Sequence, residues 1–219
     1  MSDTSGISAA GAVYRHVKDR VLTGDLEGGR MVSEGEVSST LGVSRTPVRE
    51  AFLRLEVEGW LRLFPKRGAL VLPVAPHEID EVLDARALLE SHAAADVVTR
   101  PDDLAALVDA LDAAIEAQRT SHEAGDLPGY TEADAEFHRL VAESGRNSLL
   151  AGFYRTLRER QQRMTADSVR GRTAAAATVL DEHRVLRDLL AAGDVAGFGR
   201  GLVEHLDHTH RPHSHGGTR

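Results

Sequence analysis

The chain has 219 residues, a formal net charge of −8, 42% hydrophobic residues and no cysteine. This length suits two domains with separate cores, and the lack of cysteine excludes disulfide bonds and thiolate metal sites, which leaves His, Asp and Glu as metal ligands. The N-terminal segment lacks a basic-then-apolar signal and no run of about 18 apolar residues occurs, so we expect a cytoplasmic protein without a membrane partner.

The acidic charge is unevenly distributed along the chain. Residues 1–76 carry 10 Lys and Arg against 9 Asp and Glu, whereas the remaining residues carry 16 against 25. The first third is therefore compatible with nucleic-acid binding although the whole chain is acidic. We expect a DNA-binding domain at residues 1–75, a helical domain at 76–210 and a His-rich flexible tail at 211–219.

Two short helices are expected before residue 43. The first spans about residues 7 to 23, because valines recur there at helical spacing, at Val13, Val17 and Val21. The segment SEGEVSSTLG predicts a second helix, which Ser33 can cap in a capping box with Glu36 and which ends at Gly42.

The segment SRTPVREAFLRLEVEG predicts a third helix, separated from the second by a turn so short that the two helices must cross steeply. Apolar residues at helical spacing define its buried face: Val48, Ala51, Phe52 and Leu55. Ser44 can cap this helix, and Arg45, Thr46 and Arg49 crowd its N-terminal end. In helix-turn-helix proteins that end enters the major groove, where arginine donates paired hydrogen bonds to guanine.

Two short strands are expected at residues 60–64 and 69–74, around the turn PKRG, with Lys66 and Arg67 at the tip of the hairpin. Two arginines on an arbitrary helix are usually a solvated face. Here a capped helix, a glycine turn, a helix with a basic N-terminus and a basic-tipped hairpin occur in succession. This order is typical of a winged helix-turn-helix DNA reader.

The segment GVSRTPVREAFLRLEVEGWLRLFPKRGALV resembles the DNA-binding domain of the GntR family of bacterial transcription regulators. The resemblance implies that Arg45, Thr46 and Arg49 contact operator DNA, and that Gly68 lets the wing approach the minor groove. One departure concerns Gly35, where the family often has an arginine. One expected DNA contact is therefore missing, and the operator sequence or affinity can differ accordingly.

From residue 77 onward the pattern is helical throughout, with breaks at Pro, Gly and Asn signals, so we expect an all-α antiparallel bundle. The expected helices cover residues 77–99, 102–121, 128–144, 147–164, 173–192 and 194–208. The fold class is thus mainly α, with an N-terminal winged helix-turn-helix domain.

Three histidines lie on apolar faces of these helices. Asp134 and His138 are four residues apart, which separates them by only about 40° around a helix. His183 and His205 belong to two further apolar stripes. A single such histidine is more often a hydrogen-bonded core residue than a ligand. Three beside a buried carboxylate favour a divalent cation, for which Zn²⁺, Ni²⁺, Mn²⁺ and Fe²⁺ all fit the N/O ligands.

The segments DAEFH, GRNSLL, DEHRVL and EHL resemble parts of the C-terminal FCD ligand-binding domain of the FadR subfamily within the GntR family. The resemblance implies that the metal ligands are Asp134, His138, His183 and His205. It also implies that Arg86, in DARALLE, meets an effector carboxylate, and we assign Asn147 of GRNSLL to effector binding. The alternative for Arg86 is a salt bridge to the residue four positions on, Glu90. His208 and His210 lie close enough to His205 to compete for its role, but we assign the histidines after His205 to a solvated tail, namely His208, His210, His213 and His215.

The sequence therefore predicts a homodimeric repressor of a catabolic operon, which is not an enzyme. It binds an inverted-repeat operator, because one recognition helix covers few base pairs, and a small organic acid at the metal alters operator affinity. Two alternatives stay open at this point. One is a metal-dependent enzyme, for which no separate general base is apparent, and the other is an architectural DNA binder with a structural metal.

Overall fold

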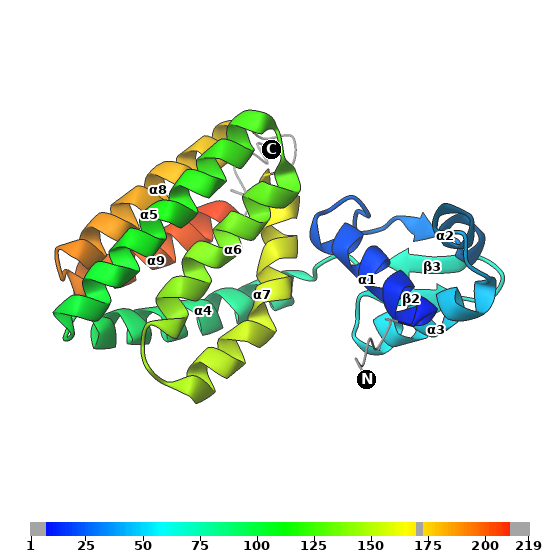
Figure 1. Ribbon diagram of the computed structural model, residues 1–219, viewed down its shortest axis with the longest axis horizontal. Coiled ribbons are helices and arrows are strands. Elements are labelled where there is room, and N and C mark those ends of the chain that lie inside the picture. Colours follow the sequence, from blue (N-terminus) through cyan, green and yellow to red (C-terminus); the bar gives the residue numbers. More distant parts are fainter. Residues whose placement is uncertain (1–7, 170–172, 211–219) are drawn as a thin grey trace, which may run out of the picture. The chain divides into compact units, whose positions relative to one another are not determined.

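The computed structural model describes residues 8–169 and 173–210, and the chain divides into two compact units at residues 1–74 and 75–219. Figure 1 shows helices beside a small sheet in the first unit and helices in the second. The predicted fold class is confirmed, a winged helix-turn-helix domain followed by a helical bundle. No helix within the described ranges is long and apolar enough to cross a membrane.

The N-terminal unit has a three-stranded antiparallel sheet with the order β1-β3-β2. Its elements are, in chain order, α1 (Ala9–Leu22), β1 (Met31–Val32), α2 (Glu34–Leu41), α3 (Arg45–Val57), β2 (Leu61–Phe64) and β3 (Gly68–Val71). Sequence reasoning missed β1, because two residues are too few to show strand alternation. The third strand ends at Val71 instead of residue 74, since Pro73 has no N–H with which to extend the ladder.

Ser33 and Gly42 bound α2 as expected, whereas the capping roles expected of the Glu36 carboxylate and the Ser44 hydroxyl are not observed among the described residues. The Ser33 hydroxyl accepts a hydrogen bond from the Glu36 N–H at 3.0 Å, while the Glu36 carboxylate contacts Arg30 at 3.4 Å. Gly42 ends α2 in the left-handed region, with φ of 65°. Ser44 occupies the N-cap position of α3, but its side chain makes no capping hydrogen bond. Its hydroxyl is therefore left at the exposed end of the helix.

The apolar stripes of α1 and α3 form the core of this unit. The predicted inward residues of α3 are all buried, namely Val48, Ala51, Phe52 and Leu55. A buried polar cluster adds to this packing: Lys18 on α1 donates hydrogen bonds to Tyr14 at 2.7 Å and to Glu58, after the C-terminal end of α3, at 3.1 Å. These contacts attach the C-terminal end of α3 to α1.

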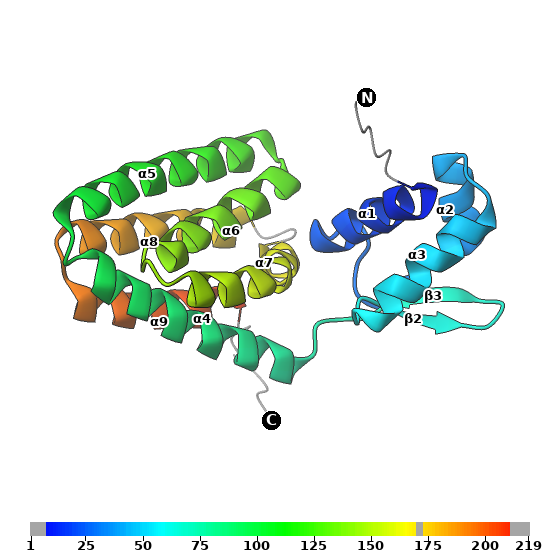
Figure 2. The same cartoon turned by 60° about the horizontal axis from the view of Figure 1, so that its bottom comes forward.

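The C-terminal unit consists, within the described residues, of the helices α4 (Pro76–Val97), α5 (Pro101–Ala124), α6 (Leu127–Glu143), α7 (Ser148–Val169), α8 (Thr173–Ala191) and α9 (Val195–His210). Figures 1 and 2 show α5 lying beside α6 and α8, and contacts between α4 and α9 and between α6 and α7 complete the bundle. These helices match the six expected from the sequence to within a few residues, apart from a longer α7.

The expectation that the histidines after His205 lie in a solvated tail is wrong for two of them. His208 and His210 belong to α9 and not to a tail, and His210 is buried with 4% exposure because its ring lies beside Arg86 and Ser168. His-rich composition suggested a solvated end, but the α9 helix continues and places His210 inside the bundle. His213 and His215 lie outside the described residues.

Candidate metal centre and DNA-reading surface

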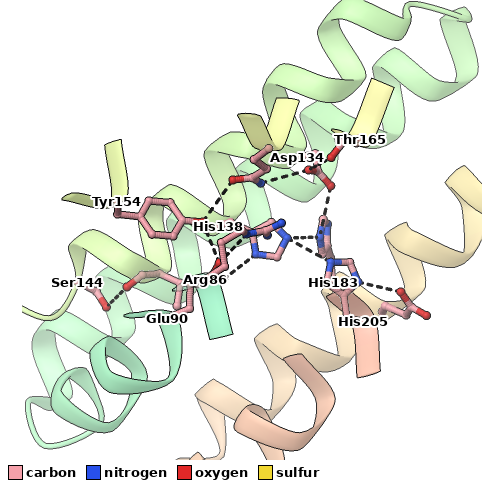
Figure 3. A network of polar contacts seen from close by, with 12 residues as sticks. Arg86, Glu90, Asp134, His138, Ser144, Tyr154, Thr165, His183 and His205 are labelled. Carbon is pink, nitrogen blue, oxygen red and sulfur yellow. Dashed lines mark hydrogen bonds and ion pairs between the residues drawn. The ribbon is translucent and has the colours of Figure 1, made fainter. Parts of the chain in front are cut away.

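Three buried imidazoles converge inside the bundle, from α6, α8 and α9 (Figure 3). His138 Nε2 lies 3.2 Å from His183 Nε2 and 3.2 Å from His205 Nε2. The ligand atoms of all three residues lie within 4.8 Å of one another, and none of the three side chains is more than 2% exposed. The three histidine-bearing faces therefore meet, which the sequence alone could not show.

The opposite edge of each ring faces an oxygen acceptor. The Nδ1 contacts are His138 to Glu90 Oε2 at 2.7 Å, His183 to Gln118 Oε1 at 2.8 Å and His205 to Glu182 Oε2 at 2.8 Å. An Nδ1–H that donates to such an acceptor leaves the Nε2 lone pair pointing at the other two rings. Three lone pairs that face one another repel, so the arrangement is favourable when a cation lies between them. The triad could therefore hold a metal.

Asp134 lies at the edge of this cluster. Its Oδ1 is 3.7 Å from His183 Nε2. The carboxylate accepts hydrogen bonds from Gln118 and Gln161, both at 3.3 Å, and from the Thr165 hydroxyl at 3.0 Å. The structure thus brings together all four residues predicted as ligands, with the carboxylate slightly farther from the centre than the imidazoles.

Burial controls the protonation of the site. It depresses the pKa of both His138 and His183 well below the usual imidazole range, with the Arg86 charge adding to the effect. Burial also raises the pKa of Asp134, while Arg86 opposes this shift. Neutral imidazole is the form that coordinates metals, so His138 and His183 are in the competent form at a pH where free histidine is partly protonated.

Arg86 is fully buried on α4 and contacts the same network. Its Nε donates to Glu90 Oε1 at 3.1 Å, so the salt bridge anticipated as an alternative to effector binding is present. Its Nη1 lies 3.5 Å from His210 Nε2, and its Nη2 has no hydrogen-bond partner among the described residues. A buried guanidinium with an unpartnered donor is costly, which leaves an edge suited to an incoming anion.

Asn147 has a structural role that the sequence did not show. Its exposed side chain accepts hydrogen bonds from the N–H groups of Leu149 and Leu150 at the start of α7. The preceding turn is fixed by Gly145, where a Cβ would lie 3.0 Å from Ala93. Helix capping by Asn147 and close packing at Gly145 therefore account for the segment GRNSLL. Effector binding by Asn147 stays a prediction.

The predicted DNA-contacting residues are exposed at the N-terminal end of α3 and on the wing: Ser44, Arg45, Thr46, Arg49, Lys66 and Arg67. Within the described part of the chain, Arg45 and Arg49 form no ion pair or hydrogen bond that would neutralise them. Their guanidinium groups remain available to nucleic acid. Contact with DNA stays a prediction for each of these residues.

The wing turn depends on Gly68. The Arg67 N–H donates to the Phe64 carbonyl at 3.1 Å, and Lys66 adopts a positive φ of 64°. Gly68 has φ of 98°, and a Cβ there would lie 2.4 Å from the Val32 carbonyl oxygen. The fold itself therefore requires glycine at this position, independently of any approach to the minor groove.

Sequence reasoning missed several polar side chains that contact the candidate ligands or the hydrogen-bond partners of those ligands. They are Gln118, Tyr154, Gln161, Thr165 and Glu182. Gln118 carried a usable signal, because it continues the apolar stripe of Leu111 and Ile115 as a polar residue at a core position. The others could be recognised only once the packing of α7 and α8 against α6 and α9 was known.

Two family models match the chain: the bacterial regulatory proteins of the gntR family at residues 9–71, and the FCD domain at residues 81–208. A transcriptional regulator encoded in the TAR-I ttuE-ttuC' intergenic region of Agrobacterium vitis is 34% identical over 62% of this chain and 81% of its own. The gluconate operon transcriptional repressor of Bacillus subtilis is 26% identical over 89% of this chain and 81% of its own. A GntR regulator structure from Rhodococcus sp. RHA1, 22% identical, superposes with a TM-score of 0.74 over 90% of this chain and 93% of its own. The chain therefore belongs to the GntR family of transcription regulators, in the FadR-like subfamily that carries a C-terminal FCD domain.

Proposed function

We propose that this regulator is a homodimeric repressor of a catabolic operon, and that a small organic acid bound at a divalent metal in the helical unit changes its affinity for the operator. The observation that carries this proposal is the convergence of three oriented imidazoles in a chain that also has an exposed, basic recognition helix. The gluconate operon transcriptional repressor among its relatives supports control of a catabolic operon.

At the operator, the N-terminal end of α3 enters the major groove, where Arg45 and Arg49 read bases while Ser44 and Thr46 contact the backbone or base edges. The wing approaches the neighbouring minor groove. Lys66 and Arg67, at its exposed turn, contribute phosphate contacts, and Gly68 allows the close approach. Two such units reading an inverted repeat supply the selectivity that one recognition helix lacks.

In the helical unit, Asp134 completes the ligand set of His138, His183 and His205 around Zn²⁺, Ni²⁺, Mn²⁺ or Fe²⁺. The effector presents a carboxylate to the open edge of Arg86, and Asn147 contributes a further polar contact. The bound metal supplies a Lewis-acidic centre for other oxygens of the same acid.

The dimer forms through the helical unit. Apolar side chains remain exposed there, including Leu149 and Phe153 one turn apart on α7, which are 83% and 55% exposed, and Leu88 on α4, which is 72% exposed. Neighbouring exposed apolar side chains such as Leu149 and Phe153 support an association surface that includes α7.

The test begins with an operator selected from random duplexes by the purified protein. Arg45→Ala and Arg49→Ala should each weaken binding to this operator by about 1–3 kcal/mol, because each removes a paired contact to a base. Arg119→Ala removes the same charge from an exposed site on α5 and should leave operator affinity unchanged. Unchanged affinity in Arg45→Ala would contradict the assigned reading surface.

The effector half of the proposal is tested on the same DNA by fluorescence anisotropy. Metal-loaded protein is titrated with a panel of small carboxylic and sugar acids at constant ionic strength, and at least one acid should shift operator affinity. Chelation of the metal should abolish that shift. Operator binding that no acid alters would instead favour an architectural DNA binder with a structural metal.

A further inference from the structure

The Glu90 carboxylate lies between Arg86 and one of the candidate metal ligands, His138. Its Oε1 accepts hydrogen bonds from Arg86 Nε at 3.1 Å and from the Tyr154 hydroxyl at 2.8 Å, and its Oε2 contacts His138 Nδ1 at 2.7 Å (Figure 3). Arg86 and Glu90 are both fully buried. One carboxylate thus holds the arginine proposed to bind effector and also orients a candidate metal ligand.

The charge of this buried network depends on whether a metal is bound. With neutral imidazoles and ionised carboxylates it contains one positive group, Arg86, and two carboxylates that are each at most 1% exposed, Glu90 and Asp134, while the partly exposed Glu182 adjoins it through His205. Carboxylates therefore outnumber the positive group without a metal, and a divalent cation adds two positive charges. Because an uncompensated charge in a buried site is costly, the metal-free state disfavours a further anion and the metal-loaded state favours one.

The guanidinium offers a place for that anion. Glu90 occupies only the Nε side of Arg86, whereas among the described residues Nη2 has no hydrogen-bond partner and Nη1 has only the 3.5 Å contact to His210. A carboxylate can accept two parallel hydrogen bonds from the edge formed by Nη1 and Nη2. Glu90 can therefore stay in place while a ligand binds, and the two carboxylates then share the charge of one arginine.

We propose that the Glu90 carboxylate competes with the effector for Arg86. It disfavours binding of an acid at Arg86 in the metal-free protein, and it limits the metal-loaded protein to a ligand that places one carboxylate charge at Arg86. This inference rests on the proposed function, since it assumes that the effector binds at Arg86 beside a metal. Metal and acid then bind with positive coupling, and Glu90 determines how strongly the arginine attracts the acid.

The test uses acetate as the probe, because it is a minimal carboxylate, and full-length protein either free of metal or loaded with Zn²⁺. Acetate affinity is measured by calorimetry at ionic strength held constant with chloride. The wild type should bind acetate at least about fivefold more tightly with Zn²⁺ than without it. Glu90→Gln keeps the side-chain shape but removes the competing charge, so its Zn²⁺-loaded form should bind acetate at least about fivefold more tightly than the wild type.

The matched control is Glu182→Gln. Glu182 contacts a metal ligand in the same way, through His205 Nδ1 at 2.8 Å, but its side chain is 25% exposed and its carboxylate forms no ion pair with Arg86. Both variants should lower Zn²⁺ affinity, by about 10- to 100-fold as for other lost partners of ligands. Only Glu90→Gln should tighten acetate binding.

A second variant keeps the proposal testable where Glu90→Gln fails to fold. Tyr154→Phe removes one donor from Glu90 Oε1, so Glu90 holds Arg86 more strongly and acetate binding should weaken.

Acetate binding that is as strong in Arg86→Met as in the wild type would contradict the proposed function, because the acid would then bind elsewhere. If Arg86→Met loses acetate binding while Glu90→Gln binds it no more tightly than the wild type, only the role of Glu90 is overturned.

Discussion

Replacing Gly68 with alanine tests whether the wing is built as described, because two separate costs can be estimated from the structure. The backbone at Gly68 has φ of 98°, a conformation that costs a residue with a Cβ about 1–2 kcal/mol. The new Cβ would also lie 2.4 Å from the Val32 carbonyl oxygen and 3.0 Å from Ser33 Cα, so β1 must move. Gly68→Ala should therefore lower the free energy of unfolding by more than the backbone strain alone.

Movement of β1 disturbs the contacts that attach the residues just before it, Gly29 and Arg30, to β3. The Gly29 N–H donates to the Val71 carbonyl at 2.8 Å, and the Val71 N–H donates to the Arg30 carbonyl at 2.9 Å. Each lost hydrogen bond costs about 0.5–1.5 kcal/mol. Together with the strained backbone, this gives a loss of about 2–5 kcal/mol in the free energy of unfolding of the N-terminal unit.

Urea unfolding followed by Trp60 fluorescence measures this loss. Trp60 is the single tryptophan of the chain and is buried in the N-terminal unit, so its emission reports on that unit. Gly42→Ala is the matched control, because Gly42 also has a positive φ, of 65°, but a Cβ added there would meet no described atom within 4 Å. A loss in Gly68→Ala no larger than in Gly42→Ala would refute the argument from the close approach to β1.

Three further predictions concern charge. Lys66→Ala should weaken binding to all DNA sequences and reduce the slope of log affinity against log salt by about 0.9, as measured by anisotropy between about 50 and 200 mM salt. Gly35→Arg should increase that slope by a similar amount, because a Cβ at Gly35 would lie 3.8 Å from Arg45 Nη2 and the added charge would extend the basic surface; an unchanged slope would place residue 35 away from DNA. Burial holds the pKa of His210 well below the usual value near 6.5, so the unfolded chain takes up a proton first and stability falls as the pH drops below 6.5. His210→Gln should lessen this fall, by up to about 1.4 kcal/mol per pH unit, in urea unfolding of metal-free protein followed by circular dichroism.

Helical periodicity predicted most of the fold. The prediction was most accurate where apolar spacing and capping signals agreed, as for the helix between Ser33 and Gly42. Periodicity could not predict β1, because a strand of two residues has no period and forms only by pairing with β3. It also failed for His210, since composition alone could not show that the helix continues and brings this ring beside Arg86.

The sequence indicated the candidate ligands but not the side chains that contact and orient them. Spacing placed His138, His183 and His205 on apolar faces, yet their meeting depends on how α6, α8 and α9 pack. The same packing decides that Glu90 contacts both Arg86 and His138, whereas the sequence showed only an i, i+4 pair. Tertiary contacts of this kind leave no local pattern from which they could be read.

The most direct test of the central claim is the metal content of protein purified without an affinity tag, loaded with metal and desalted. Wild-type protein should retain about one divalent ion per chain, and His183→Ala should retain far less, because it removes one of three converging nitrogens. The variant should still bind operator DNA, since Arg45 and Arg49 are untouched, but no acid should alter that binding. Equal metal retention in the two proteins would contradict a metal site formed by the three imidazoles.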